Sequence, residues 1–129
     1  MAILRLSAPY DPRDDQPLES LFHAGDLRFK EPDLAHIRAI MARVPTIVDI
    51  YLDRPAVIPE IAAESAALLA NFGASDAAIL DVVFGRFAPS AKLPFELPSS
   101  MEAVRRQKPD VPYDSDDPLF RFGHGLTYD

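Results

Sequence analysis

The densest group of reactive side chains lies near the start of the chain, in the stretch Ser7–Asp15, which reads SAPYDPRDD. It holds three carboxylates, one guanidinium and one phenol, and Glu19 and His23 follow within the next eight residues. Carboxyl and imidazole groups exchange protons with bound molecules when a fold positions them beside a reacting atom. A solvated acidic loop, in which Arg13 pairs locally, would have the same composition. Both interpretations stay open until the surrounding elements are considered.

Three short apolar segments predict the strands that position this stretch. Residues 2–6 (AILRL) end just before it, and residues 46–52 (TIVDIYL) are β-branched and nearly all apolar, which is typical of a strand covered on both faces. Residues 66–71 (AALLAN) predict a third strand, although their alanines and leucines would also suit a helix. In open α/β sheets ligands bind beyond the carboxyl ends of the strands, where the acidic stretch begins.

Helices are predicted between and after these strands. Residues 32–43 repeat apolar side chains at the spacing of one helix face, and residues 58–63 predict a shorter helix. A third is expected to begin at the N-cap residue Ser75 and to run to Phe84, with Gly85 ending it. This alternation predicts an α/β fold, namely a three-layer α/β/α sandwich with a mostly parallel sheet.

The last third of the chain predicts a different kind of structure. Six prolines lie within residues 89–118, so we expect residues 86–129 to form an extended strap on the domain surface. Ser99 and Glu102 stand at capping-box spacing and predict a short helix over residues 100–106.

We therefore expect one partial domain, with a βαβ core at residues 1–85 and the strap at residues 86–129. Three parallel strands make a narrow sheet with two edges that need cover. Either the tail supplies a further strand near residues 93–97, or the sheet is truncated on its N-terminal side.

Composition excludes several classes of function. The chain has 129 residues and a formal net charge of −7, which disfavours nucleic acid as a partner because phosphate backbones are also anionic. It has no cysteine, and its three histidines are scattered, so we expect neither a metal site nor a cofactor. No run is long enough to span a membrane, and the first residues are too quickly polar for a signal peptide. These features favour a cytoplasmic location.

Four stretches resemble the motifs of family 3 glycoside hydrolases. Two stand in the tail, FGRFAPSAKLPFELP at residues 84–98 and DPLFRFGHGLTY at residues 117–128. The other two are NFGASDAAILDVVFG at residues 71–85 and TIVDIYLDRPAVIP at residues 46–59. Their order along the chain matches the C-terminal part of the second domain of that family.

The resemblance implies a retaining, exo-acting β-glucosidase or β-xylosidase. In this family a (β/α)8 barrel carries the nucleophilic aspartate, and an α/β sandwich domain lends the general acid/base. The expected partners are therefore a β-linked glucoside or xyloside and an N-terminal barrel. Retaining hydrolysis needs two carboxyl groups about 5–5.5 Å apart. Because this chain supplies at most one of them, we predict that the isolated chain is inactive.

The family's acid/base glutamate lies in an acidic loop of Glu-x-Glu-Gly type after the corresponding strand. Asp11 aligns with its first acidic position, and the second falls on Arg13 or, with a slip of one residue, on Asp14. We predict Asp14 as the acid/base, followed by Glu19, Asp11 and Asp15. The predicted substrate-binding residues are Arg13, His23, Asp53 and Arg54. Simpler alternatives exist for three of them. Asp53 and Arg54 could form only a turn, and His23 could be only a polar surface residue.

Asp49 interrupts the apolar run at residues 46–52. A buried, unpaired carboxylate is unfavourable, so we expect Asp49 to be paired, protonated or at a sheet edge, and Arg5 and Arg54 are the candidate partners.

Two alternatives to an enzyme part remain. The chain could be a non-catalytic docking module or a remnant that associates with a barrel or with itself, because an open sheet edge favours a homo-oligomer. A flavodoxin-like binding domain is disfavoured because no glycine-rich phosphate loop follows the first strand.

Overall fold

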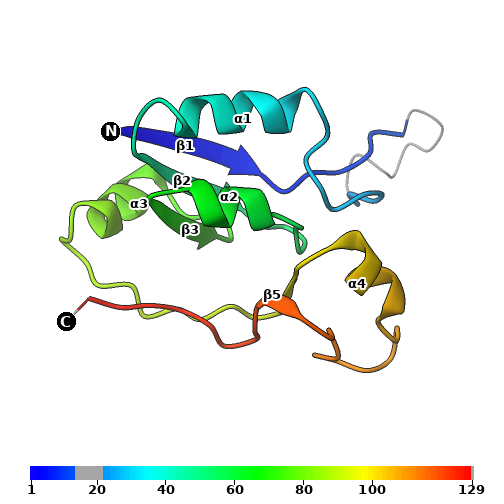
Figure 1. Ribbon diagram of the computed structural model, residues 1–129. Helices are drawn as coiled ribbons and strands as arrows, with labels where there is room; N and C mark the ends of the chain where they lie inside the picture. Colours follow the sequence, from blue (N-terminus) through cyan, green and yellow to red (C-terminus); the bar gives the residue numbers. More distant parts are fainter. Residues whose placement is uncertain (14–21, 129) are drawn as a thin grey trace.

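The computed structural model describes residues 1–13 and 22–128, and its main element is a parallel sheet. The strands β1 (Ala2–Ser7), β2 (Thr46–Tyr51) and β3 (Ala67–Asn71) lie in the order β1-β2-β3, with β2 in the centre (Figure 1). Within the described residues this sheet has three strands, so β1 forms one of its edges. All three predicted strands are confirmed, but the predicted truncation of the sheet stays a prediction.

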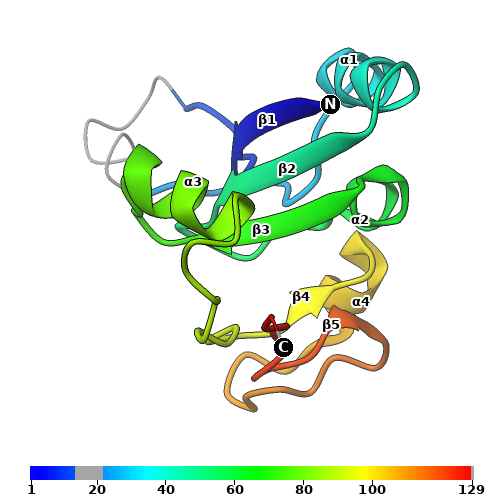
Figure 2. The same ribbon diagram turned by 90° about the vertical axis from the view of Figure 1, so that its left-hand side faces the viewer.

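Helices cover both faces of the sheet. Figure 2 shows α1 (Asp33–Met41) and α2 (Pro59–Glu64) on one side and α3 (Asp76–Val83) on the other. The predicted α/β/α sandwich is therefore confirmed. No helix in the described part of the chain is long and apolar enough to cross a membrane.

The ends of α3 follow from local sequence. The Ser75 hydroxyl oxygen accepts a hydrogen bond from the Ala78 N–H at 3.3 Å, which caps the first turn. Gly85 follows with φ +69°, a left-handed conformation that glycine adopts without steric cost. Both of these predicted helix signals are confirmed.

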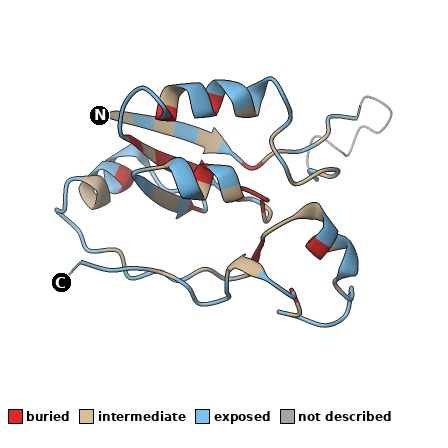
Figure 3. Ribbon diagram, viewed as in Figure 1, coloured by how far each residue is buried: buried red, intermediate tan, exposed pale blue. Residues whose placement is uncertain are grey.

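The hydrophobic core lies between β2 and the pair α1 and α2. Figure 3 shows the buried residues gathered along β2 and on the inner sides of these helices. The side chains that are at most 2% exposed there include Val48, Ile50, Leu52, Ile58 and Ile61. The alternating β1 residues Leu4 and Leu6 pack against the same cluster. This packing orients the carboxyl ends of β1 and β2 toward one side of the domain.

The tail does not extend the parallel sheet. β4 (Leu97–Pro98) pairs antiparallel with β5 (Pro118–Phe120), and α4 (Met101–Arg106) lies between them in sequence. The alternative of a further main-sheet strand near residues 93–97 is thus wrong, because this segment pairs with the C-terminal segment of the tail. Leu93 donates its N–H to the His124 carbonyl and accepts from Gly123, both at 2.9 Å.

Only some residues of the tail pack against the rest of the domain. Leu93, Phe95, Leu97 and Phe120 pack on the core, and the Tyr128 hydroxyl donates to the Val82 carbonyl at 2.7 Å. Leu126, by contrast, is 78% exposed although it is a large apolar residue of the same segment. The helix predicted over residues 100–106 forms as α4, but its N-cap is Ser100 and not Ser99, because the Ser100 hydroxyl oxygen accepts from the Ala103 N–H. The division of the chain at residue 85 stays a prediction.

Candidate functional site

The loops that follow β1 and β2 lie together at the carboxyl end of the sheet. The Ala8 N–H donates to the Tyr51 carbonyl at 2.8 Å, so the two strands stay paired to their last residues. Farther along, the Val57 N–H donates to the Leu27 carbonyl at 2.9 Å, and Arg28 and Val57 form an isolated parallel bridge. These bonds join two segments that are about 30 residues apart in the chain.

A pair of predicted site residues, His23 and Asp53, meets across these loops. His23 Nδ1 and Asp53 Oδ2 are 2.5 Å apart, and the two side chains are only 29% and 26% exposed. Tyr10 stacks on the imidazole, with ring centroids 3.8 Å apart and planes only 3° from parallel. The carboxylate and the phenol together fix the imidazole plane. The sequence contained Tyr10 in its reactive stretch but carried no signal that it would stack on His23.

Arg54 crosses from the end of β2 to the other loop. Its Nη2 donates to the Gly25 carbonyl at 2.8 Å, while Nη1 is buried without a hydrogen-bond partner in the described residues. Arg54 therefore links the two loops beside the pair of His23 and Asp53. It does not pair with Asp49, which was one of the two alternatives.

Asp11 closes the loop that contains His23. Its N–H donates to the Ala24 carbonyl at 2.9 Å, Oδ2 accepts from the Asp26 N–H at 2.8 Å, and Oδ1 bonds Lys30. Gly25 has φ +88°, and a Cβ there would come within 2.1 Å of Asp11 Oδ2, so the carboxylate fits only against glycine.

These contacts affect the chemistry of Asp11. The Lys30 ammonium, and then the Asp26 N–H, lower the pKa of its carboxyl below the ordinary value. A carboxyl that is ionised at neutral pH accepts hydrogen bonds well but lacks the proton that a general acid must donate. Asp11 is thus suited to hold the loop together, and its assignment as acid/base stays a prediction.

The other acid/base candidates, Asp14, Glu19 and Asp15, lie outside the described residues. Arg13 is exposed at the last described position before them. In the part of the chain that is described, no three His, Asp or Glu side chains are grouped so as to hold a metal ion.

Asp49 belongs to a separate, structural network on the α3 face of the sheet. Its carboxylate is 1% exposed and accepts from Arg5 Nε at 2.9 Å and from Asn71 Nδ2 at 2.8 Å. Arg5 also pairs with Asp76 at the start of α3. The alternative that Arg5 pairs with Asp49 is confirmed, and the network joins β1, β2, β3 and α3.

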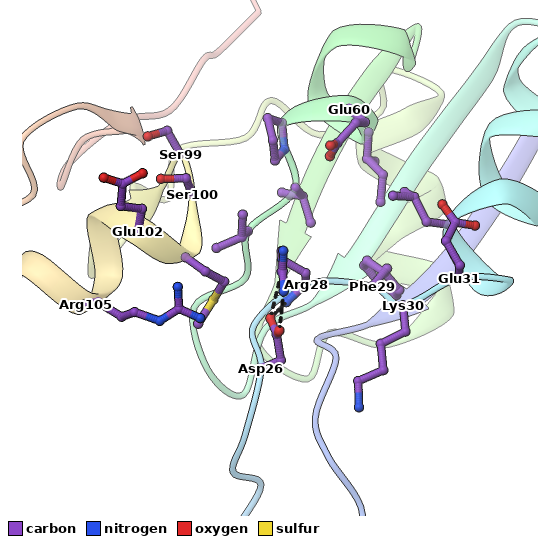
Figure 4. Close-up of a pocket in the computed structure, with 16 residues that line it drawn as sticks. Asp26, Arg28, Phe29, Lys30, Glu31, Glu60, Ser99, Ser100, Glu102 and Arg105 are labelled. Carbon is purple, nitrogen blue, oxygen red and sulfur yellow. Dashed lines mark hydrogen bonds and ion pairs between the residues drawn. The ribbon is translucent and has the colours of Figure 1, made fainter.

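A cleft of about 650 Å³ lies beside the loops, between residues 26–31, the start of α2 and α4 (Figure 4). Arg28 binds Asp26 on one wall through Nε at 3.1 Å and Nη2 at 2.7 Å. This contact lowers the pKa of the Asp26 carboxyl to about 2. Sequence reasoning missed the cleft because its walls come from three segments that only the folded chain brings together.

Comparison with known proteins agrees with the four motifs. Residues 15–128 match the Glycosyl hydrolase family 3 C-terminal domain. The chain is 54% identical over 127 residues to "Probable beta-glucosidase C" of Aspergillus flavus, and 45% identical over 135 residues to "Periplasmic beta-glucosidase/beta-xylosidase" of Dickeya chrysanthemi. These alignments cover 98% and 99% of the chain but only 20% of each relative, so the chain spans about a fifth of their length.

A solved structure shares the fold. The chain superposes on the β-glucosidase from Listeria innocua in complex with isofagomine with a TM-score of 0.69 and 20% identity, over 98% of this chain and 20% of that one. The family match and the relatives confirm the resemblance inferred from the motifs. The chain belongs to glycosyl hydrolase family 3, whose C-terminal domain it represents.

Proposed function

We propose that the chain is the C-terminal part of a retaining, exo-acting β-glycosidase of the β-glucosidase or β-xylosidase type. Its loop after β1 would border an active site whose nucleophile lies on a (β/α)8 barrel. The observation that carries this proposal is the meeting of His23 and Asp53 at the carboxyl ends of β1 and β2, where ligands bind in open α/β sheets. The names of the relatives supply the substrate class, a β-glucoside or β-xyloside.

The division of labour follows from the chemistry of retention. The barrel carboxylate attacks the anomeric carbon while a group on this chain protonates the leaving oxygen, and the same group later takes a proton from water. Asp14, Glu19 and Asp11 are the proposed carboxyl candidates for that group. The proposed substrate contacts are Arg13, His23, Asp53 and Arg54.

A chimaeric enzyme tests this proposal. The 129 residues would replace the matching 135-residue region of the Dickeya relative, and turnover of p-nitrophenyl β-glucoside and β-xyloside would be measured. We expect activity in the chimaera and none above a buffer control in the isolated chain. Turnover by the isolated chain, or an inactive chimaera that is folded, would contradict the proposal.

A second candidate, a non-catalytic association module, is favoured by one observation. Strand β1 is an edge of the sheet in the described residues, and an edge strand presents unpaired backbone groups to another chain. This candidate predicts that the isolated chain forms a homo-oligomer or binds a separate barrel. A monomer in sedimentation at high concentration, together with an active chimaera, would eliminate it.

We also propose a cytoplasmic location, because the chain has no cysteine. The Dickeya relative is named as a periplasmic enzyme. Fractionation of the cells that make this protein would decide between the two compartments.

A further inference from the structure

A pair of exposed aromatic rings lies on the tail, outside the hydrophobic core. Tyr113, between α4 and β5, is 54% exposed, and Phe122, just after β5, is 51% exposed. The two rings contact each other, with centroids 4.4 Å apart and planes 30° from parallel. Aromatic side chains stabilise a fold mainly through the surface that they bury. About half of the surface of each residue contributes nothing of this kind and is accessible to a ligand.

The backbone of Tyr113 is in an unfavourable conformation. Its φ is +60°, and among the described residues it is the only non-glycine residue with a positive φ. The turn is held on both sides of the ring, because Asp114 Oδ2 accepts from the Lys108 N–H at 2.9 Å. Glu96 Oε2 accepts from the Ser115 N–H at 3.2 Å and ties the turn to β4. Strained residues that the surrounding structure holds in place are concentrated at ligand sites, and here the strain accompanies a ring at the surface.

Tyr113 also forms part of the wall of a pocket of about 290 Å³. The pocket lies between the tail and the loops after β1 and β2, which contribute Leu27 and Pro55. Most of its lining is apolar, and its polar residues are Glu96, Gln107, Lys108 and Asp114. The side chains of Gln107 and Lys108 make no hydrogen bond within residues 1–13 and 22–128. An apolar pocket with a few available polar groups is the usual form of a small-molecule site.

A pyranose sugar with only equatorial hydroxyl groups matches this combination of groups. In β-glucose and β-xylose units the ring C–H groups point to the two faces, which can pack on aromatic rings, while the hydroxyl groups point outward from the ring edge. Carboxylates accept hydrogen bonds from such hydroxyl groups, and an amide or an ammonium donates to their oxygens. An anionic ligand fits less well, because Glu96 and Asp114 already carry negative charge in the lining.

We propose that Tyr113, Phe122 and the adjoining pocket form a non-catalytic binding site for β-1,4-linked gluco- or xylo-oligosaccharides. The choice of these sugars rests on the proposed β-glycosidase function, whereas the site itself is inferred from the rings and the pocket. The site takes no part in bond cleavage. It would hold substrate chains close to the loops after β1 and β2, which border the same pocket through Leu27 and Pro55.

An NMR titration of the isolated, ¹⁵N-labelled chain with cellotriose and xylotriose tests the site. We expect the backbone amide signals of Val111, Tyr113 and Asp114 to shift in a saturable manner. β-1,4-Galactotriose should bind more weakly, because its axial 4-oxygens interrupt one apolar face of each ring. The absence of saturable shifts with both cellotriose and xylotriose would overturn the proposal. Shifts that follow the protein concentration instead would also overturn it, because the rings would then contact a second copy of the chain.

Tyr113→Gly is the main variant, because glycine adopts φ +60° without steric cost, so that the ring is removed and the turn is kept. We expect its Kd for cellotriose to rise about 10-fold, with an unchanged circular dichroism spectrum. Tyr113→Phe keeps the ring and should bind like the parent chain. Phe87→Ala is the matched control, since it removes a ring that is 62% exposed in the segment after α3, and it should leave Kd unchanged. Equal Kd values for Tyr113→Gly and the parent chain would contradict the proposal.

These measurements need no barrel, so their outcome is separate from that of the chimaeric enzyme. An active chimaera together with an isolated chain that binds neither oligosaccharide would overturn this inference and leave the proposed function standing. A folded but inactive chimaera, together with oligosaccharide binding that Tyr113→Gly weakens, would support the site and contradict the proposed function.

Discussion

The two faces of the main sheet are closed in different ways. On the face covered by α1 and α2, the β2 side chains Val48 and Ile50 are fully buried against Ile61 and its neighbours. On the face covered by α3, the central buried side chain is the carboxylate of Asp49, held by Arg5 and Asn71. The first face is thus held by hydrocarbon packing, whereas the second combines one buried apolar side chain of α3, Ile79, with a small number of directed polar contacts.

The difference also appears in the exposure of apolar side chains on the α3 face. Ile3 and Tyr51, whose positions alternate onto the α3 face, are each 39% exposed, although both are large and apolar. Hydrophobic burial has no preferred direction, whereas hydrogen bonds and ion pairs lose their strength when geometry changes. We therefore expect the α1 and α2 face to dominate the free energy of unfolding, and the α3 face to depend on a few individual contacts.

The largest effect is expected on the apolar face. Ile61→Ala removes a side chain of 0% exposure and should lower the free energy of unfolding by about 2–5 kcal/mol through lost burial and a cavity. Ile3→Ala is the matched control on the other face and should lower it by less than about 1 kcal/mol. Urea unfolding followed by circular dichroism measures both. Equal losses would mean that the two faces contribute alike.

The second effect concerns the polar centre of the α3 face. Asp49→Ala leaves the Asn71 amide without its acceptor, and a buried polar group that loses its partner destabilises by about 1–3 kcal/mol. Asp49→Asn keeps an oxygen for Asn71 and should be milder. The same urea titration compares the two variants. If Asp49→Ala is as stable as the parent chain, the network does not hold this face together.

The sequence predicted the apolar face better than the polar one. The spacing of Ile37 and Met41 indicated a buried helix face, and the β-branched run of β2 indicated a central strand, because burial imposes a period that is visible in the chain. The tail was harder to predict. Apolar residues such as Leu126 look alike whether or not they pack, and the pairing of β4 with β5 depends on contacts across about 20 residues.

The candidate site shows the same limit. Residue types identified His23 and Asp53 separately, since each follows a strand on the side where ligands bind, but neither periodicity nor motif spacing could place them 2.5 Å apart. The contacts of Asp11 with Asp26 and Lys30 were equally hidden, because they depend on the turn at Gly25. The types of reactive residues can be read from the sequence, whereas their partners come from the folded loops.

A smaller effect is expected in the loop beside the site, where the contribution of one ion pair to the free energy of unfolding depends on pH. Arg28 lowers the pKa of Asp26 from 3.8 to about 2, so this pair stabilises the fold fully above pH 3.8, and the stabilisation is lost as the pH falls through 2. Because the side chain is 22% exposed and screened by solvent, we expect about 1 kcal/mol at neutral pH. Asp26→Asn should remove this contribution. Its deficit against the parent chain should shrink as the pH falls below 3.8 and vanish below pH 2, whereas that of Ile61→Ala should not change with pH.

The smallest effect is expected at the outer end of the polar network. Arg5 pairs with both Asp49 and Asp76, but the Asp76 side chain is 83% exposed while that of Asp49 is 1% exposed. Water competes for the outer carboxylate, so Asp76→Asn should shift Tm by no more than about 2 °C. Asp49→Asn removes the same charge from the other carboxylate that binds Arg5. Thermal melts of the two variants therefore compare how much each carboxylate contributes to Tm. A larger shift for Asp76→Asn would mean that the contact between Arg5 and α3, and not the buried carboxylate, stabilises this face.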